Sequence, residues 1–479
     1  MLDVNFEDGI NVEQVLRGAA PGAVAYLVGA GGCGVSGLGH LLLDAGFRVA
    51  GSDLTGNQET RELQARGAVI HQGHAANQVA QAKPFLMAWS SAIHPDNVER
   101  AEARRLGCPG VPRARVLSAL MNRRRGICVA GMHGKTTTTA LLAFALENLG
   151  ATPGYAIGSL VAQLCPHARF ANAPDGWFVA ETDESDGSLG CFTPEQAVLL
   201  NVDEDHLDYF GNIEAICEEF GAFARQTRGP VFYCADDARL AAMLGGRVGG
   251  VSYGFGAGAR YRAFIGQPQQ GGETLFQVWR ETKYLGEFRT RLPGEKNVSN
   301  ATAVVAVLHE MGHTPEKIAR AIAPFAGARR RQELLWHDGQ SRVYDDYGHH
   351  PREIAATLAA LKTPGRGRLL VAFQPHRYTR TQHLLAQFAG CFAAADLLWI
   401  TRIYAASETP LAGVSGEALA EAVRRQGQAA EYAPDLDSLR RAVRLAMRPG
   451  DTVVFQGAGD ITQAAHELAR ELAEHGIGA

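Results

Sequence analysis

The residues best suited to chemistry form a glycine-rich loop, Gly131-Met132-His133-Gly134-Lys135-Thr136-Thr137. An apolar run at 126–130 has the composition of a strand, and the run at 140–146 has that of a helix. Glycines let backbone N–H groups approach phosphate oxygens, and a helix N-terminus adds a positive dipole end. Lys135 can bridge terminal phosphates, and Thr136 is placed to hold Mg²⁺. We therefore predict a nucleotide-binding P-loop; a glycine turn with a solvated lysine would not explain why strand, loop and helix coincide.

Two acidic clusters follow apolar runs of strand type in the same part of the chain. The first is 181–186, after the run at 177–180, and the second is 203–208, after the run at 197–202. Carboxylates at a strand end beside a P-loop can hold the Mg²⁺ of a nucleotide. His206 lies among acids, which favours a ligand or general base over a surface salt bridge. Such a run of acids can also be a solvated face of the protein.

A second glycine loop lies near the start of the chain. It follows a predicted strand at 23–28 and precedes a predicted helix at 36–45, and a further strand at 47–52 ends at Asp53. The glycines follow the pattern G-x-G-x-x-G, in which the loop takes a pyrophosphate and the acid takes a ribose hydroxyl. The ligand can be NAD, FAD or a nucleotide sugar. The residues concerned are Gly29, Gly31, Gly32, Gly34, Ser36 and Asp53.

Two serines and two basic clusters also follow predicted strands. Ser90 and Ser91 follow the run at 85–89, where they could contact the same ligand or serve as ordinary turn residues. The runs at 342–346 and 368–373 lead into histidine and arginine clusters, as expected where an anionic substrate meets a parallel sheet edge. Helix caps and surface ion pairs are the alternative. The cluster residues are Tyr347, His349, His350, His376, Arg377 and Arg380.

The composition is that of an ordinary globular protein. The 479 residues allow about three domains, with 46% apolar and 20% charged residues. A formal net charge of -4 gives no reason to expect a nucleic-acid surface. The sequence has no apolar run long enough for a bilayer and no signal-peptide pattern at its start, so we expect no membrane insertion and a cytoplasmic location. The region 247–291 alternates like a β-rich stretch, and a helix is predicted at 301–311.

Taken together, the motifs resemble those of the Mur ligases of peptidoglycan synthesis, over essentially the whole chain. Five strings in order carry the resemblance: G-x-H-G-K-T-T-T-T at 131–139, E-x-D-E-S-D at 181–186, D-H-x-D at 205–208, D-D-Y-G-H-H-P at 345–351 and F-Q-P-H-R-Y-T-R-T at 373–381. The resemblance implies an α/β protein of three domains. These are a Rossmann-like UDP-sugar domain (1–122), a central P-loop ATP domain (123–326) and a C-terminal Rossmann-like domain (327–479).

The resemblance also implies ligands, an activity and residue roles. The implied reaction is the ATP-dependent joining of L-alanine to the lactyl carboxylate of UDP-N-acetylmuramate, with Mg²⁺ or Mn²⁺, in a monomer or homodimer. For ATP, the implied contacts are Gly131, His133, Gly134, Lys135, Thr136, Thr137, Asn297, Asn300, Arg331, Asp346 and Tyr347. The implied metal ligands are Thr136, Glu181 and His206, and the implied catalytic residues are Lys135, Glu181, His206, His349 and Arg380. The implied substrate contacts are the first glycine loop with Asp53, Ser90 and Ser91, together with His376, Arg377 and Arg380.

Four places depart from the family pattern: Met132 in the P-loop, the stretch 187–191 after the first acidic cluster, Lys296, and Gln332 after the arginine pair. These departures affect the predicted contacts to adenine and the expected rate of the reaction. The nearest alternative function is the family's tripeptide-recycling ligase, and a second alternative is a non-catalytic nucleotide-binding protein. Folate polyglutamylation would leave the first glycine loop unexplained, and a nicotinamide oxidoreductase would have no role for Lys135. No lysine lies between Glu181 and Gly229, in line with the L-alanine-adding branch.

Overall fold

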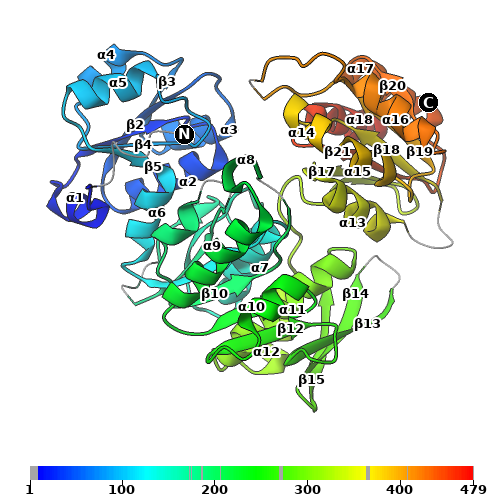
Figure 1. Cartoon of the computed structure of the whole chain (residues 1–479), viewed down its shortest axis with the longest axis horizontal. Coiled ribbons are helices and arrows are strands. Elements are labelled where there is room, and N and C mark those ends of the chain that lie inside the picture. Colours follow the sequence, from blue (N-terminus) through cyan, green and yellow to red (C-terminus); the bar gives the residue numbers. More distant parts are fainter. Residues whose placement is uncertain are drawn as a thin grey trace. The chain divides into compact units, whose positions relative to one another are not determined.

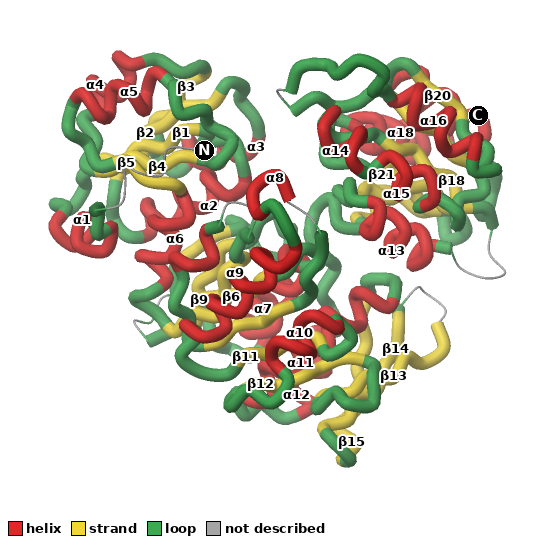
Figure 2. Tube along the Cα trace, in the orientation of Figure 1, coloured by secondary structure: helices red, strands yellow, loops and turns green. Residues whose placement is uncertain are grey.

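The chain is an α/β protein built on three sheets, as predicted (Figure 1, Figure 2). The computed structural model describes residues 9–171, 173, 175–184, 187–204, 207–268, 273–362, 367–406 and 408–477, without the side chains of 207, 208, 267 and 268. Contacts divide the chain into two compact units. Unit 1 comprises 1–266, 275–289 and 299–325, and unit 2 comprises 267–274, 290–298 and 326–479. Unit 1 contains the first sheet and most of the second, so the predicted boundaries at 122/123 and 326/327 stay predictions.

The first sheet has five parallel strands in the order β3-β2-β1-β4-β5. This is a doubly wound order, in which ligands bind beyond the carboxyl ends of the strands. Helices on both faces explain why the central strand β1 is almost wholly apolar and buried. The elements are α1 (Val12–Gly18), β1 (Val24–Val28), α2 (Cys33–Asp44), β2 (Arg48–Asp53), α3 (Gln58–Ala65), β3 (Val69–Gln72), α4 (Ala76–Ala82), β4 (Leu86–Trp89), α5 (Val98–Arg105), β5 (Gly110–Pro112) and α6 (Arg113–Met121).

The second sheet has ten strands in the order β15-β14-β13-β12-β11-β10-β6-β9-β7-β8. Strands β6, β7 and β9 to β12 pair in parallel, which brings their carboxyl ends to one edge. The elements are β6 (Arg125–Ala130), α7 (Lys135–Asn148), β7 (Gly154–Ala156), β8 (Ala168–Arg169), β9 (Trp177–Glu181), β10 (Gln196–Leu199), α8 (Leu207–Phe210), α9 (Ile213–Gln226), β11 (Val231–Cys234), α10 (Ala238–Leu244), β12 (Gly250–Gly254), β13 (Tyr261–Pro268), β14 (Thr274–Arg280), β15 (Lys283–Thr290), α11 (Glu295–Glu310) and α12 (Pro315–Ile322).

The third sheet has six strands in the order β16-β17-β21-β18-β19-β20, and only the edge strand β16 pairs antiparallel. Successive side chains of a strand point to opposite faces. In β18, Leu369, Val371 and Phe373 pack with α13, α15 and α16, whereas Leu370 and Ala372 pack with α17 and α18. The elements are β16 (Glu333–His337), β17 (Arg342–Asp346), α13 (Pro351–Leu361), β18 (Leu369–Phe373), α14 (Tyr378–His383), α15 (Leu385–Gly390), β19 (Leu397–Thr401), α16 (Gly416–Arg425), β20 (Glu431–Ala433), α17 (Leu436–Ala446), β21 (Thr452–Gln456) and α18 (Ile461–His475).

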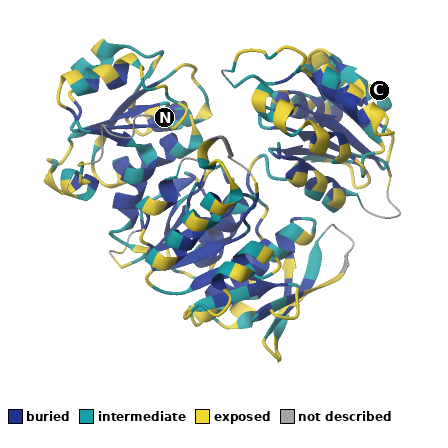
Figure 3. Ribbon diagram, in the orientation of Figure 1, coloured by how far each residue is buried: buried dark blue, intermediate teal, exposed yellow. Residues whose placement is uncertain are grey.

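Burial follows this layered pattern in each sheet, with buried strands and helices that turn exposed residues outward (Figure 3). The β-rich region predicted at 247–291 is confirmed by β12 to β15. Two predicted helix starts were late, because α2 begins at Cys33 and α11 begins at Glu295. In both cases glycine or polar residues fill the first turn, where the helix pattern is weakest. In the described part of the chain, no helix is both long and apolar enough to cross a bilayer.

Candidate active site

The P-loop connects β6 to α7, as predicted. Gly131 and Gly134 have φ values of 137° and 88°, a backbone region that favours glycine. A Cβ added to Gly134 would lie 2.8 Å from Asn300 Oδ1, so the predicted nucleotide contact Asn300 lies directly against the loop. The backbone of His133 is held by the Asn201 side chain, whose Oδ1 accepts from His133 N and whose Nδ2 donates to His133 O, both at 2.8 Å.

Lys135 occupies the first turn of α7 and is ion-paired with the first acidic cluster. Its Nζ donates to Glu184 Oε1 and to Gly131 O, both at 2.7 Å. Burial opposes the charged form of Lys135, but the carboxylates of Glu184 and Asp183 outweigh it and raise the pKa of the lysine. Burial raises the pKa of Glu184 to about 7, with Lys135 acting in the opposite direction. The lysine therefore stays charged, and Glu184 holds it near the loop.

Glu181 ends β9 next to the P-loop, because Glu181 pairs in register with Val129 of β6. Its Oε1 accepts from Thr136 Oγ1 at 2.9 Å, and its Oε2 accepts from Gly158 N at 2.8 Å. A hydroxyl and a carboxylate at this distance are hard oxygen ligands of the kind that Mg²⁺ prefers. Thr136 and Glu181 thus fit a shared metal ion, whereas His206 lies outside the described residues.

The first glycine loop connects β1 to α2, and its predicted partners come to the same sheet edge. Val28 pairs in register with Ser52 and with Trp89, so Asp53 and Ser90 follow neighbouring strand ends. Asp53 Oδ2 accepts from Gly31 N at 2.8 Å. A Cβ added to Gly29, whose φ is 82°, would lie 3.5 Å from Ser90 Cβ. Loop, acid and serine therefore lie together as predicted.

Two side chains near the first glycine loop differ from what the sequence predicted for this binding site. The Ser36 hydroxyl is fully buried, where it donates to Cys33 O at 3.2 Å and lies 3.4 Å from His167 Nε2. Sequence reasoning gave no role to Arg113, yet a Cβ on Gly34 would lie 2.9 Å from its Cζ. Arg113 Nη2 also lies 3.5 Å from Asp183 Oδ2. Its place directly after β5, at a strand end of the same edge, was the available signal.

In unit 2, the buried Asp346 at the end of β17 organises the loop that follows it. Its Oδ1 accepts from Gly348 N at 2.9 Å and from Gln456 Nε2 at 3.0 Å, and its Oδ2 accepts from Gln332 N at 2.9 Å. Burial raises the pKa of Asp346, with the Arg331 charge acting in the opposite direction. Asp346 therefore holds backbone and amide donors in place beside the predicted nucleotide contacts.

The predicted nucleotide contacts of unit 2 form a compact group. The guanidinium groups of Arg330 and Arg331 each lie 4.9 Å from the Tyr347 ring centroid. Asn297 Nδ2 donates to Gln332 Oε1 at 2.8 Å, so one departure from the family pattern directly contacts a predicted adenine contact. This geometry links the unusual Gln332 to the orientation of the Asn297 amide.

The two basic clusters of unit 2 meet at one edge of the third sheet. The His349 and His376 rings are 5.6 Å apart, and Arg380 Nη1 lies 3.3 Å from His376 Nδ1. Burial, together with the charges of His349 and Arg380, lowers the pKa of His376 to about 3. His376 is therefore a neutral imidazole in a region of positive charge, which suits the recognition of an anion.

The backbone of this edge is strained at three residues that are not glycine. Arg330, Gln332 and Arg377 have φ values of 58°, 50° and 68°. Side chains other than glycine rarely adopt such angles, and in folded proteins they cluster at functional sites. The Arg377 conformation is held by its N–H, which donates to Tyr404 O at 2.8 Å. The strain supports the view that these residues bind a ligand.

Family models match each of the three sheets. The Mur ligase family catalytic domain model matches residues 24–125, the Mur ligase middle domain model matches 129–308, and the Mur ligase glutamate ligase domain model matches 330–459. The chain belongs to the Mur ligase family.

Individual relatives agree with this assignment. A UDP-N-acetylmuramate--L-alanine ligase of Solidesulfovibrio magneticus is 42% identical over 93% of this Mur ligase and 98% of the relative. The crystal structure of a UDP-N-acetylmuramate-alanine ligase of Thermotoga maritima has a TM-score of 0.81 at 26% identity and covers 94% of this chain and 99% of its own. The resemblance inferred from sequence and the three-domain α/β fold class are thereby confirmed.

One further structural relative is a ligase that was solved with a nucleotide. The MurF ligase of Thermotoga maritima, solved in complex with ADP, has the same fold, with a TM-score of 0.60 at 15% identity over 89% of this Mur ligase and 95% of its own chain. The roles assigned to individual residues from sequence stay predictions. The structure does bring them together in three groups: the P-loop with Glu181, Glu184 and Asn300; the first glycine loop with Asp53 and Ser90; and the edge of the third sheet.

Proposed function

We propose that this Mur ligase joins L-alanine to the lactyl carboxylate of UDP-N-acetylmuramate and converts ATP to ADP and phosphate. The observation that carries the proposal is the 42% identity to a ligase of that name over nearly the full length of both chains. The P-loop, with its paired Lys135 and Thr136–Glu181 contact, supports a reaction that consumes ATP.

The reaction needs ATP because a carboxylate has no good leaving group. A lactyl carboxylate oxygen attacks the γ-phosphorus, the bond to the β-phosphate oxygen breaks, and ADP leaves. The acyl phosphate then accepts the uncharged amine of L-alanine at its carbonyl carbon. The carbon–oxygen bond to phosphate breaks, the amine nitrogen loses a proton, and the products are the amide and phosphate.

The residues of the P-loop serve the phosphoryl transfer. Lys135 is charged and its side chain is only 14% exposed, and it would turn from Glu184 to the terminal phosphate oxygens when ATP binds. Charge of this kind, fixed in a dry site, stabilises the transferring phosphoryl group. Thr136 and Glu181 would hold Mg²⁺, which neutralises phosphate charge when bound. His206 stays a predicted third ligand.

The edge of the third sheet serves the carboxylates. Arg377 and Arg380 supply charge for the lactyl and amino-acid carboxylates, and His376 stays neutral beside them. A neutral imidazole can accept a hydrogen bond from the incoming amine, which a charged one cannot do. His349, at 5.6 Å from His376, completes this group.

The first glycine loop serves the UDP portion. The N-terminus of α2 directs backbone N–H groups toward a pyrophosphate, and Arg113 lies close to Gly34 with a charge of the required sign. Asp53 holds Gly31 N, which fixes the loop and also leaves a carboxylate near the ribose position. A UDP-sugar therefore explains the presence of the first glycine loop. A protein that only binds ATP would not need this second loop.

The test is phosphate release from ATP by purified full-length protein with UDP-N-acetylmuramate and Mg²⁺, with L-alanine or the tripeptide added to separate samples. We expect release that depends on L-alanine and is lost in Lys135→Ala. Lys317→Ala, an exposed lysine on α12, is the matched control and should keep full activity.

Two results would contradict the proposal. Release only with the tripeptide would assign the chain to the recycling ligases. Absence of release in every sample, with ATP still bound, would make it a nucleotide-binding protein without catalysis and would focus attention on Lys296 and Gln332.

A further inference from the structure

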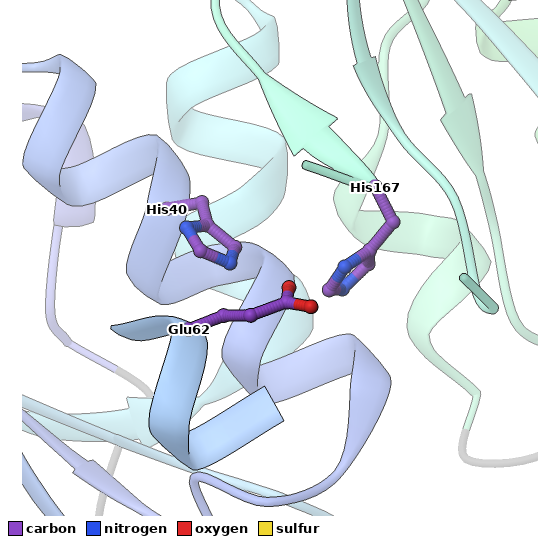
Figure 4. Close-up of side chains that lie close together, drawn as sticks. All are labelled: His40, Glu62 and His167. Carbon is purple, nitrogen blue, oxygen red and sulfur yellow. The ribbon is translucent and has the colours of Figure 1, made fainter. Parts of the chain in front are cut away.

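Two buried histidines and a glutamate converge between the first and second sheets of unit 1. His40 lies on α2, Glu62 on α3, and His167 directly precedes β8. One potential ligand atom of each lies within 4.8 Å of those of the other two. Figure 4 shows the Glu62 carboxylate directed between the two imidazole rings. The group lies outside both glycine loops, and neither the reaction nor the family motifs use it.

The burial of these histidines has an energetic cost that hydrogen bonds offset at only one nitrogen of each ring. His40 and His167 are 0% and 1% exposed. Within the described structure, His40 Nε2 and His167 Nδ1 have no hydrogen-bond partner. A buried nitrogen without a hydrogen bond destabilises the folded protein. Two of them beside a carboxylate indicate a ligand that binds nitrogen and oxygen together.

The surroundings of His167 suit a metal ligand. Its Nε2 lies 2.9 Å from Cys33 O, to which it donates, so the ring proton is on Nε2 and the lone pair is on Nδ1. A histidine that donates its second nitrogen to a backbone carbonyl is the usual partner arrangement of a metal-binding imidazole. Burial lowers the pKa of His40 to about 4 and also lowers that of His167, so both rings are neutral.

We propose that His40 Nε2, His167 Nδ1 and the Glu62 carboxylate form a structural Zn²⁺ site, with a water molecule as fourth ligand. Two imidazoles and one carboxylate are a common zinc donor set. Tetrahedral bonds of ~2.05 Å bring ligand atoms to about 3.3 Å from one another. The partly exposed Glu62, with three side-chain torsions, can supply the inward movement. The metal would join α2 and α3 to the chain that enters β8.

Arg66 controls access to this site. Its Nη1 donates to His40 Nδ1 at 2.9 Å, which leaves the ring proton of His40 on Nε2. Zinc at Nε2 requires that proton to move to Nδ1 and Arg66 to withdraw toward Asp44, which it already contacts at 2.5 Å. Glutamine at position 66 would offer a carbonyl to Nδ1–H. Arg66→Gln should therefore bind zinc more tightly than the natural protein.

The test is a titration of chelator-treated, full-length protein with ZnCl₂ in the absence of nucleotide and Mg²⁺, read by competition with a chromophoric chelator. We expect one equivalent of Zn²⁺, a Co²⁺ form with the visible absorption of a tetrahedral site, and a thermal midpoint that rises with Zn²⁺. Glu62→Gln should weaken binding at least tenfold, and Arg66→Gln should strengthen it a few-fold. Glu59→Gln, one turn earlier on α3, is the matched control and should bind like the natural protein.

A second acid–histidine group in unit 2, formed by Glu333, Asp345 and His466, provides the competing explanation. Loss of Zn²⁺ in His466→Gln but not in Glu62→Gln would overturn the proposal. Equal binding by the natural protein and Glu62→Gln, or weaker binding by Arg66→Gln, would overturn it as well.

Discussion

The P-loop and the edge of the third sheet, which we propose as two anion-binding sites, hold their charged groups in opposite ways. At the P-loop, one lysine is surrounded by acids, and the carboxylates of Glu184 and Asp183 raise its pKa. At the edge of the third sheet, arginines surround a histidine, and burial with neighbouring positive charge lowers the pKa of His376 to about 3. At the P-loop, the charge of Lys135 is paired with Glu184 until a bound phosphate takes the place of that carboxylate. The second site places positive charge around a neutral imidazole.

The backbone differs in the same way. The P-loop obtains its unusual conformations from Gly131 and Gly134, which adopt them without strain. The third-sheet edge has them at Arg330, Gln332 and Arg377, which carry side chains. The proposed phosphate site can therefore bind through backbone N–H groups. The proposed carboxylate site binds through guanidinium groups, and its backbone is strained where it positions them.

The largest expected effect is at the P-loop lysine. Lys135→Ala removes the only side-chain cation that the described P-loop supplies, and loss of one such contact lowers kcat by about 100- to 1000-fold. Steady-state phosphate release measures it, with Lys317→Ala as control. A decrease of less than tenfold would show that the acid-paired lysine does not turn to the phosphates.

A smaller loss is expected at the third-sheet edge, where several cations share the charge. Arg380→Ala should lower kcat/KM for UDP-N-acetylmuramate by roughly 10- to 100-fold, since a hydrogen bond to a charged group contributes about 1.5–3 kcal/mol. The KM for ATP should change little. Arg425→Ala, an exposed arginine on α16, is the control. An equal change in the KM for ATP and the KM for UDP-N-acetylmuramate would contradict the assignment of ATP to one site and the carboxylates to the other.

Asn201 tests how far the P-loop depends on side chains that hold its backbone. Asn201→Ala removes both hydrogen bonds to His133 and should weaken ATP binding about 30-fold, at about 1 kcal/mol for each bond. Asn148→Ala removes a hydrogen bond to Ala321 O at the far end of α7 and should leave ATP affinity unchanged. Isothermal titration with ATP compares the two, and equal affinities would show that the loop is rigid without Asn201.

The last prediction concerns the pH dependence of stability. The folded-state pKa of His376 lies below the unfolded value of about 6.5, so its stabilisation is present above pH 6.5 and is lost as pH falls toward 3. His376→Gln cannot titrate. Its unfolding free energy, measured in urea from pH 7 to 4, should fall less steeply than that of the natural protein, by at most about 1.4 kcal/mol per pH unit. Parallel slopes would mean that His376 is not held neutral.

Sequence reasoning located the central strands and both glycine loops because buried parallel strands are apolar and glycine loops have fixed spacing. It gave no strand at β3 or β20, which are short and partly exposed, and none at β11 or β19, which are buried and apolar but lead into no motif of the family. It placed Glu181 beside the P-loop because both follow predicted parallel strands. It could not predict that Asn201, Arg113 and Glu184 contact the two glycine loops or Lys135. Those depend on pairing register between strands far apart in the chain, and on which side chain turns toward a loop.

The measurement that tests the account most directly follows the carboxylate oxygen. UDP-N-acetylmuramate labelled with ¹⁸O in its lactyl carboxylate is incubated with the protein, ATP and L-alanine, and the released phosphate is analysed by mass spectrometry. The account predicts one ¹⁸O atom in each phosphate, because the carboxylate oxygen attacks the γ-phosphorus and leaves with phosphate when the amine attacks. Unlabelled phosphate formed together with the L-alanine product would contradict it.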